Sequence, residues 1–128
     1  MKTQRFLPIV LAGIVLMLLN ACATYPKSGQ AALVGNWTNS LGTVWMIKAD
    51  GTFDVDLNRD GKRDAWGTYM VSGDTMTIHG TGGKVPHGCK GDGVYKFSRA
   101  DKDSLQFTFV KDSCKLRKKN VLLGWQRK

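Results

Sequence analysis

Residues 43–57, TVWMIKADGTFDVDL, carry the pattern that decides the fold. Asp50-Gly51 lies between two apolar-rich runs, and both residues tolerate the positive φ angles that a two-residue hairpin turn requires. In the second run, Phe53 to Leu57, the odd-numbered residues are apolar and the even-numbered ones are aspartates. This alternation is typical of a strand with one buried and one solvated face. The stretch therefore predicts two antiparallel strands joined by a tight turn.

The same short-strand pattern continues on both sides of this hairpin, with turn residues at the spacing of about 8–12 that is typical of all-β domains. One helical turn is expected at Ala31 to Val34, and no helix is expected between the strands. Eight strands joined in chain order favour an all-β fold, a small up-and-down antiparallel barrel, with a β-sandwich as the alternative. The predicted strands lie near 35–39, 43–49, 52–57, 65–71, 75–79, 95–97, 105–109 and 121–127.

The cysteines Cys89 and Cys114 follow the fifth and the seventh predicted strand. In an up-and-down barrel the loops after odd-numbered strands share one end, so these two residues are brought to the same rim. We therefore expect a disulfide between them, provided that the protein is exported to an oxidising compartment. A metal site made by the two cysteines with His79 and His87 is the alternative, although no C-x-x-C spacing supports it.

The first 22 residues resemble a bacterial lipoprotein signal. Lys2 and Arg5 precede the apolar run 6–19, which is too short for a membrane-spanning helix, and Ala21 provides the small residue before the cut. Cys22 would then carry the lipid, with a plain secretory signal or an uncleaved anchor as alternatives. We expect a signal peptide at 1–21, a lipid-anchored tether at 22–30 and a barrel domain at 31–128, attached to the outer membrane and facing the periplasm.

The charge of the chain is strongly basic, with 19 Lys and Arg against 10 Asp in 128 residues. An exported location removes nucleic acid from the candidate partners, so anionic lipid or an anionic envelope sugar is the expected counterpart. The alternative is that the charge only keeps the domain soluble. Basic residues cluster once, between Lys111 and Lys119.

Gly35-Asn36-Trp37 at the start of the first predicted strand, with Arg127 in the last, resembles the G-x-W pattern of lipocalins. The segments 89–95 and 112–117 are similar to segments of small lipocalin-like bacterial lipoproteins. The resemblance implies that Trp37, beside Gly35, plugs the closed end and that Arg127 packs over it. It also implies binding of a small apolar ligand. The T-D-Y motif of the family is absent, and the chain is shorter than ordinary lipocalins.

Residues 56–64, DLNRDGKRD, match the opening of a calcium-binding loop, D-x-N-x-D-G. Gly67 stands where an EF-hand has its bidentate Glu, and neighbouring basic residues weaken cation binding. The alternative is a hairpin loop whose side chains accept hydrogen bonds from their own backbone, a series of Asx turns. If calcium binds, the expected ligands are the side chains of Asp56, Asn58, Asp60 and Asp64 and the carbonyl of Lys62.

No Ser, His, Cys or carboxylate arrangement suggests an activated nucleophile, so we do not expect an enzyme. Calcium is the one candidate cofactor. The favoured function is binding or shielding of a small apolar ligand or lipid by a lipid-anchored barrel. The alternative is a non-enzymatic structural or interaction module of the envelope, with calcium as its candidate stabilising ion and its protein partners unknown. The aromatic candidates for lining a ligand pocket are Trp45, Trp66, Tyr95, Phe97, Phe107 and Phe109. The favoured alternative is that such side chains fill the barrel, with any pocket opening at the rim formed by the odd-numbered loops.

Overall fold

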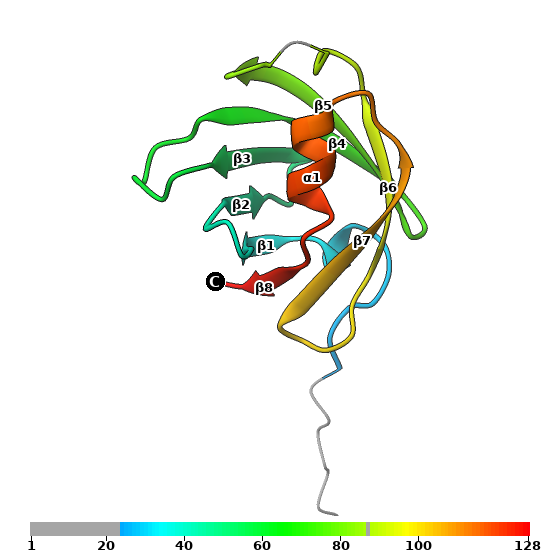
Figure 1. Ribbon diagram of the computed structural model, residues 1–128. Coiled ribbons are helices and arrows are strands. Elements are labelled where there is room, and N and C mark those ends of the chain that lie inside the picture. Colours follow the sequence, from blue (N-terminus) through cyan, green and yellow to red (C-terminus); the bar gives the residue numbers. More distant parts are fainter. Residues whose placement is uncertain (1–23, 87) are drawn as a thin grey trace, which may run out of the picture.

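Eight antiparallel strands pair in chain order, and the last strand pairs with the first, so that the sheet closes into a barrel (Figure 1). The computed structural model describes residues 24–86 and 88–128. The predicted up-and-down barrel is confirmed, and the sandwich alternative is wrong. The strands are β1 (Gly35–Thr38), β2 (Val44–Ile47), β3 (Thr52–Asp56), β4 (Ala65–Ser72), β5 (Thr75–Gly83), β6 (Gly93–Ser98), β7 (Ser104–Lys111) and β8 (Trp125–Arg127).

The hairpin that opened the sequence analysis forms as β2 and β3, with Gly51 at φ +86° in its turn. Trp45 pairs with Val55 and Ile47 with Phe53, so the apolar residues of both strands lie on one face. These side chains join the interior of the barrel, where Phe53 and Trp45 are at most 5% exposed. The alternating pattern thus determines which face of the sheet is the core.

Glycines allow β4 and β5 to approach each other closely near the open end of the barrel. A Cβ on Gly67 would lie 2.0 Å from the carbonyl oxygen of His79, and a Cβ on Gly82 would lie 2.5 Å from the Trp66 ring. The pairing shifts by one residue between Trp66 and Gly67, which is a β-bulge. The fifth strand was predicted to end at residue 79, but the glycine-rich residues 80–83 extend β5 because they pair with β4.

The closed end of the barrel is covered by a single 3₁₀ turn, η1 (Gln30–Ala32), close to the helical turn that the sequence predicts. Leu33 directly after it is fully buried, and the backbone N–H of Gly29 donates to Gly73 in the turn between β4 and β5. Tyr25 also donates its hydroxyl to the carbonyl of Ala100, in the turn between β6 and β7. Tyr25 and Gly29, in the second part of the predicted tether, thus contact the barrel directly.

A helix, α1 (Lys115–Val121), separates β7 from β8, where the sequence analysis expected no helix and a strand from Val121 onward. The run 115–119 consists of good helix formers, and Cys114 provides an N-cap whose Sγ accepts from the N–H of Arg117. Gly124, at φ +78°, turns the chain into β8. The last strand is therefore only three residues long.

The predicted signal peptide, Cys22 and His87 lie outside the described residues. Within residues 24–86 and 88–128, no helix is long and apolar enough to cross a membrane.

Candidate functional site

A cavity of about 310 Å³ opens at the end of the barrel where the loops after the odd-numbered strands meet. Its floor is formed by Trp45, Phe53 and Trp125, and residues of the β5–β6 loop and of α1 line its mouth. A cavity of this size falls at the small end of the range for ligand pockets, about 300–1,000 Å³. Its lining residues are Trp45, Phe53, Val55, Leu57, Ala65, Trp66, Ile78, Gly80, Gly82, Lys84, Val85, Pro86, Cys89, Cys114, Leu116, Arg117, Asn120, Val121 and Trp125.

The floor of the cavity is a packed aromatic layer. The Trp45 ring lies 5.1 Å from that of Trp125 and 5.5 Å from that of Phe107, and it meets Phe53 edge-on. Trp45 Nε1 is buried and has no hydrogen-bond partner among the described residues, whereas Trp125 Nε1 donates to the carbonyl of Val121. This layer separates the cavity from the filled half of the barrel.

Two of the six predicted pocket residues, Trp45 and Trp66, line the cavity. Tyr95, Phe97 and Phe107 do not line this cavity and are buried in the core, as the filled-barrel alternative has it. Their large side chains come from β6 and β7 and pack edge-on against one another, because an eight-stranded barrel is barely wide enough to hold its own side chains. Phe109 is also outside the cavity, since its ring is 43% exposed and lies against Tyr95 and Lys118.

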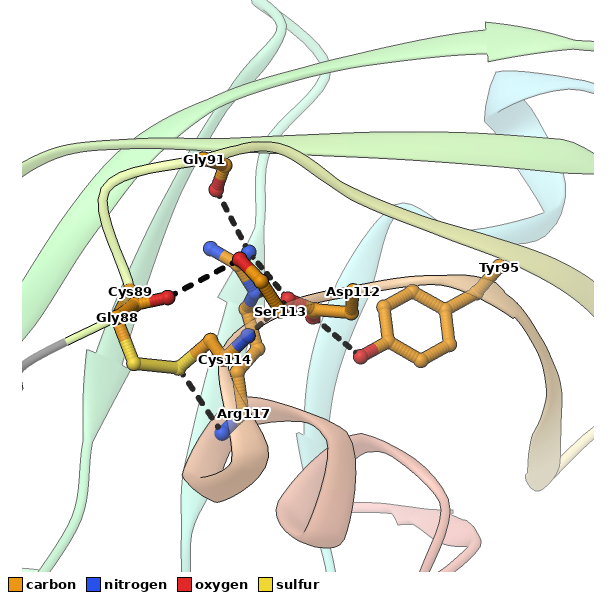
Figure 2. Close-up of a disulfide and its surroundings, with 8 residues drawn as sticks. All are labelled: Gly88, Cys89, Gly91, Tyr95, Asp112, Ser113, Cys114 and Arg117. Carbon is orange, nitrogen blue, oxygen red and sulfur yellow. Dashed lines mark hydrogen bonds and ion pairs between the residues drawn. A yellow bond between two sulfur atoms is a disulfide. The ribbon is translucent and has the colours of Figure 1, made fainter.

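The predicted disulfide between Cys89 and Cys114 is confirmed, and it joins the β5–β6 loop to the start of α1 (Figure 2). Both residues are buried and both line the cavity. Because the sulfurs are bonded to each other, the alternative of a metal site with cysteine ligands is wrong. His79, which the metal-site alternative also included, instead places its Nδ1 2.6 Å from Oδ1 of Asp92.

Beside the disulfide, the carboxylate of Asp112 is enclosed by the side chains of Arg117 and Tyr95 (Figure 2). Arg117 binds both carboxylate oxygens, Nε at 2.6 Å and Nη2 at 2.7 Å, and the Tyr95 hydroxyl donates to the same group. Arg117 Nη2 also donates to the carbonyl of Gly91, and the Cys114 N–H donates to Asp112. The network therefore fastens the β5–β6 loop, β6 and α1 together.

Burial raises the pKa of the Asp112 carboxyl, but the hydrogen bonds from Arg117, Tyr95 and Cys114 outweigh it, so its net pKa lies below the ordinary value. The pKa of Tyr95 is raised, first by burial and then by its hydrogen bond to the carboxylate. For Arg117, burial lowers the pKa, and the contact with Asp112 more than reverses this. At neutral pH the network is a bidentate ion pair with a neutral phenol.

Asn120 holds the other end of α1 to the β1–β2 loop. Its side-chain oxygen accepts from Asn39 Nδ2 and, at 3.2 Å, from the hydroxyl of Thr43. These α1 residues were not among the predicted site residues. The sequence pattern that could have identified this face of the helix is the spacing of Cys114, Arg117 and Val121, which places all three on one side.

At the closed end, Trp37 is fully buried, and two guanidinium groups lie over its ring. Arg127 lies 4.4 Å from its ring centre and Arg99 lies 4.9 Å from it, while Trp37 Nε1 donates to the carbonyl of Leu33. A Cβ on Gly35, which has φ +147°, would lie 2.6 Å from Arg127 Nη1. This is the arrangement that the lipocalin resemblance implies, with Arg99 as an added partner that the sequence analysis missed.

The carboxylates of Asp56, Asp60 and Asp64 converge in the β3–β4 loop, with one oxygen of each within 4.8 Å of the others. Asp56 accepts from the N–H groups of Asn58 and Gly61, and Asp60 accepts from the N–H of Lys62. The backbone N–H of Asp60 donates to the side-chain oxygen of Asn58. The loop thus contains both the Asx turns of the hairpin-loop hypothesis and the convergent carboxylate oxygens that the calcium hypothesis requires. Calcium binding stays a prediction.

Two basic residues expected to crowd this loop point away from it. Arg59 donates to the carbonyl of Gly42 and to the hydroxyl of Thr38, and Arg63 lies 3.9 Å from the Trp66 ring centre. Lys84 instead approaches the loop, with its Nζ 3.3 Å from Asp64. The Leu57 N–H holds the pKa of Asp64 below its ordinary value, burial opposes this shift, and Lys84 adds to it.

Comparison of the chain with protein-family models, with curated protein sequences and with solved structures finds no match. The barrel is compatible with a lipocalin-like fold.

Proposed function

We propose that this protein binds one small apolar molecule, or a single acyl chain of a lipid, in the cavity at the open end of its barrel. The observation that carries the proposal is the cavity itself, about 310 Å³ with an aromatic floor and mostly aliphatic walls. Moving apolar surface from water into such a space is favourable by about 25 cal/mol per Å². The function is binding without catalysis.

The rim of the cavity supports an amphipathic ligand whose polar end remains at the mouth. Lys84, Arg117 and Asn120 are the polar side chains among the lining residues. Arg117 and Asn120 are held by part-buried contacts with Asp112 and Asn39. Lys84 pairs with Asp64 at 3.3 Å, but its side chain is 73% exposed and therefore still open to a ligand. Lys84 is therefore the group at the mouth that is best placed to meet a polar or anionic head.

We also propose that Cys22 carries a lipid that anchors the barrel to the outer membrane, facing the periplasm. The contact of Tyr25 with Ala100 supports this arrangement, because it fixes the start of the domain at the closed end. A short link from Cys22 would hold that end near the membrane and leave the cavity mouth free. This is the architecture of a lipocalin-like envelope lipoprotein.

Ligand binding is tested with an apolar dye whose fluorescence rises in dry surroundings, followed by displacement with fatty acids and lysophospholipids. Gly80 lines the cavity, and a Cβ placed there meets no atom within 4 Å, so Gly80→Phe should fill the space without a clash. We expect this variant to bind the dye at least ~10-fold more weakly, which corresponds to about 1.4 kcal/mol. Thr108→Phe, on an exposed position of β7, is the matched control. Equal binding by both variants would contradict the proposal.

Lipidation is tested by metabolic labelling with a fatty acid. We expect the full chain to incorporate the label and Cys22→Ala to lose it, because acylation requires the thiol. The double variant Cys89→Ala, Cys114→Ala should keep the label. A labelled Cys22→Ala variant would refute the anchor.

A structural or interaction module stabilised by calcium is the second candidate function, and the convergence of Asp56, Asp60 and Asp64 favours it. It differs from the first in one measurable property. A calcium-stabilised module gains thermal stability from calcium without binding the dye, whereas a ligand carrier binds the dye with or without calcium.

A further inference from the structure

The outward face of α1 is rich in lysine and leucine and carries few carboxylates. Its inward face holds Cys114, Arg117 and Asn120, which are fixed by the disulfide, the ion pair and the amide contact described above. The opposite face carries Lys115 and Lys119, both exposed. The short helix lies across the barrel (Figure 1) and is held there by these contacts. Its lysine-bearing side faces solvent.

Exposed apolar side chains accompany these lysines. Leu116 is 61% exposed, and Leu122 and Leu123 directly after the helix are 37% and 40% exposed. Leu41, 59% exposed, lies on the β1–β2 loop that Asn39 and Asn120 hold against α1. Large aliphatic side chains grouped in this way on a surface mark a site of contact with another molecule or a membrane.

The charge of this face is not compensated within the described residues. Lys111, Lys115, Lys118 and Lys119 take part in none of the ion pairs of residues 24–86 and 88–128. Asp112, the one carboxylate between residues 109 and 123, is neutralised by Arg117 and has no exposed side-chain surface. Four positive charges are thus free to attract anions.

We propose that this face, residues 109–123 together with Leu41, docks onto an anionic phospholipid bilayer. The lysines match the negative surface potential of such a membrane, and the leucines match its apolar boundary. An acidic polysaccharide would use the lysines alone and would leave the leucines in water. The Lys118 Nζ, 3.9 Å from the Phe109 ring centre, shows how the two kinds of side chain are interleaved on this face.

Docking in this orientation places the cavity mouth at the docked bilayer. Because the proposed Cys22 anchor holds the closed end at the outer membrane, the docked bilayer is a second one, on the opposite side of the barrel. Leu116 belongs both to the exposed face and to the lining of the cavity. An acyl chain could then pass between bilayer and cavity without crossing water. The docking itself goes beyond the proposed ligand binding and does not depend on an occupied cavity.

The test measures amide hydrogen exchange of residues 109–123 in the full chain, with vesicles of phosphatidylcholine alone or mixed in equal parts with phosphatidylglycerol. This readout is local, so attachment of the chain through its apolar residues 6–19 to either vesicle does not affect it. We expect exchange in this segment to slow several-fold on the anionic vesicles, to stay unchanged on the neutral ones, and to recover at high salt.

The double variant Lys115→Glu, Lys119→Glu should lose this protection. The matched control Lys96→Glu, Lys102→Glu carries the same change of charge at exposed positions of β6 and the β6–β7 turn and should keep it. Gly80→Phe should also keep it, which separates docking from ligand binding. Absence of protection, equal protection on both vesicles, or equal loss in the two double variants would each overturn the proposal.

Discussion

The two ends of the barrel are closed by different physical means. At the closed end, Trp37 and Leu33 are fully buried, and the guanidinium groups of Arg99 and Arg127 lie over the indole. At the open end, a cavity takes the place of core side chains, and α1 is held across it by a disulfide, a bidentate ion pair and an amide hydrogen bond. One end is stabilised by packing and the other by specific cross-links.

This difference shows how a small barrel can keep a cavity without losing its shape. The atoms around an empty space lack contact partners on one side, which costs dispersion and burial energy. The cysteines, Asp112 and Arg117 replace part of that energy with bonds that need no filled interior. Stability at the two ends should therefore respond to different substitutions.

The largest expected effect is at the packed end. Trp37→Ala should lower the free energy of unfolding by about 4 kcal/mol, because it removes a fully buried indole and leaves a void. Trp66→Ala, in the partly exposed wall of the cavity, should cost only about 1 kcal/mol. Urea unfolding compares the two, with Trp37→Phe as the milder variant if Trp37→Ala does not fold. Equal losses would show that the ends do not differ.

Removing the disulfide should have the next largest effect. The bond links residues separated by 25 positions, so Cys89→Ser, Cys114→Ser should cost about 3 kcal/mol. Hydrogen exchange should accelerate at α1 first and leave η1 unchanged, because η1 lies at the closed end. Faster exchange at both ends to the same degree would contradict the division between them.

A smaller, pH-dependent effect is expected from Asp112. Its pKa is lower in the folded than in the unfolded chain, where Asp titrates at about 3.9. The stability it contributes is therefore fully present above about pH 4. It is lost as the pH falls below this value through the folded pKa. Unfolding free energies measured from neutral to acidic pH should show this loss.

The matched variant Asp112→Asn should be less stable at neutral pH and should lack this part of the acid dependence. Tyr95→Phe, which keeps the ring but removes one hydrogen bond to the carboxylate, should retain most of it. If wild type and Asp112→Asn lose stability in parallel at low pH, the ion pair is not the source of the effect.

The smallest expected effect concerns the β3–β4 loop at the open end. If its carboxylates hold calcium with the weak affinity of extracellular sites, about 1 mM, then ~10 mM calcium should stabilise the fold by about 1.4 kcal/mol. Asp60→Ala should abolish the rise in melting temperature without unfolding the barrel, since Asp60 is exposed. Unchanged melting of the wild type in calcium would leave the loop as a series of Asx turns.

The regular parts of the fold follow from local patterns. Alternation along 43–57 and 105–108, with Asp-Gly and Gly-Asp turns between strands, predicts where strands lie and which face is buried. The alternation fails at Phe109, which is 43% exposed although it follows the period. Periodicity specifies which side of the sheet a residue occupies, but it does not specify how far along the barrel the packed interior extends.

The sequence by itself predicted the strand order and favoured the barrel over a sandwich and the disulfide between Cys89 and Cys114 over a metal site, because hairpins between neighbouring strands leave each loop on a known end. Only the tertiary structure decided that 115–121 is a helix over a cavity and that Tyr95 serves the Asp112 network instead of a ligand. The reason is that a cavity exists where side chains from strands distant in the chain fail to meet. That outcome depends on their summed volumes and orientations, which no local pattern records.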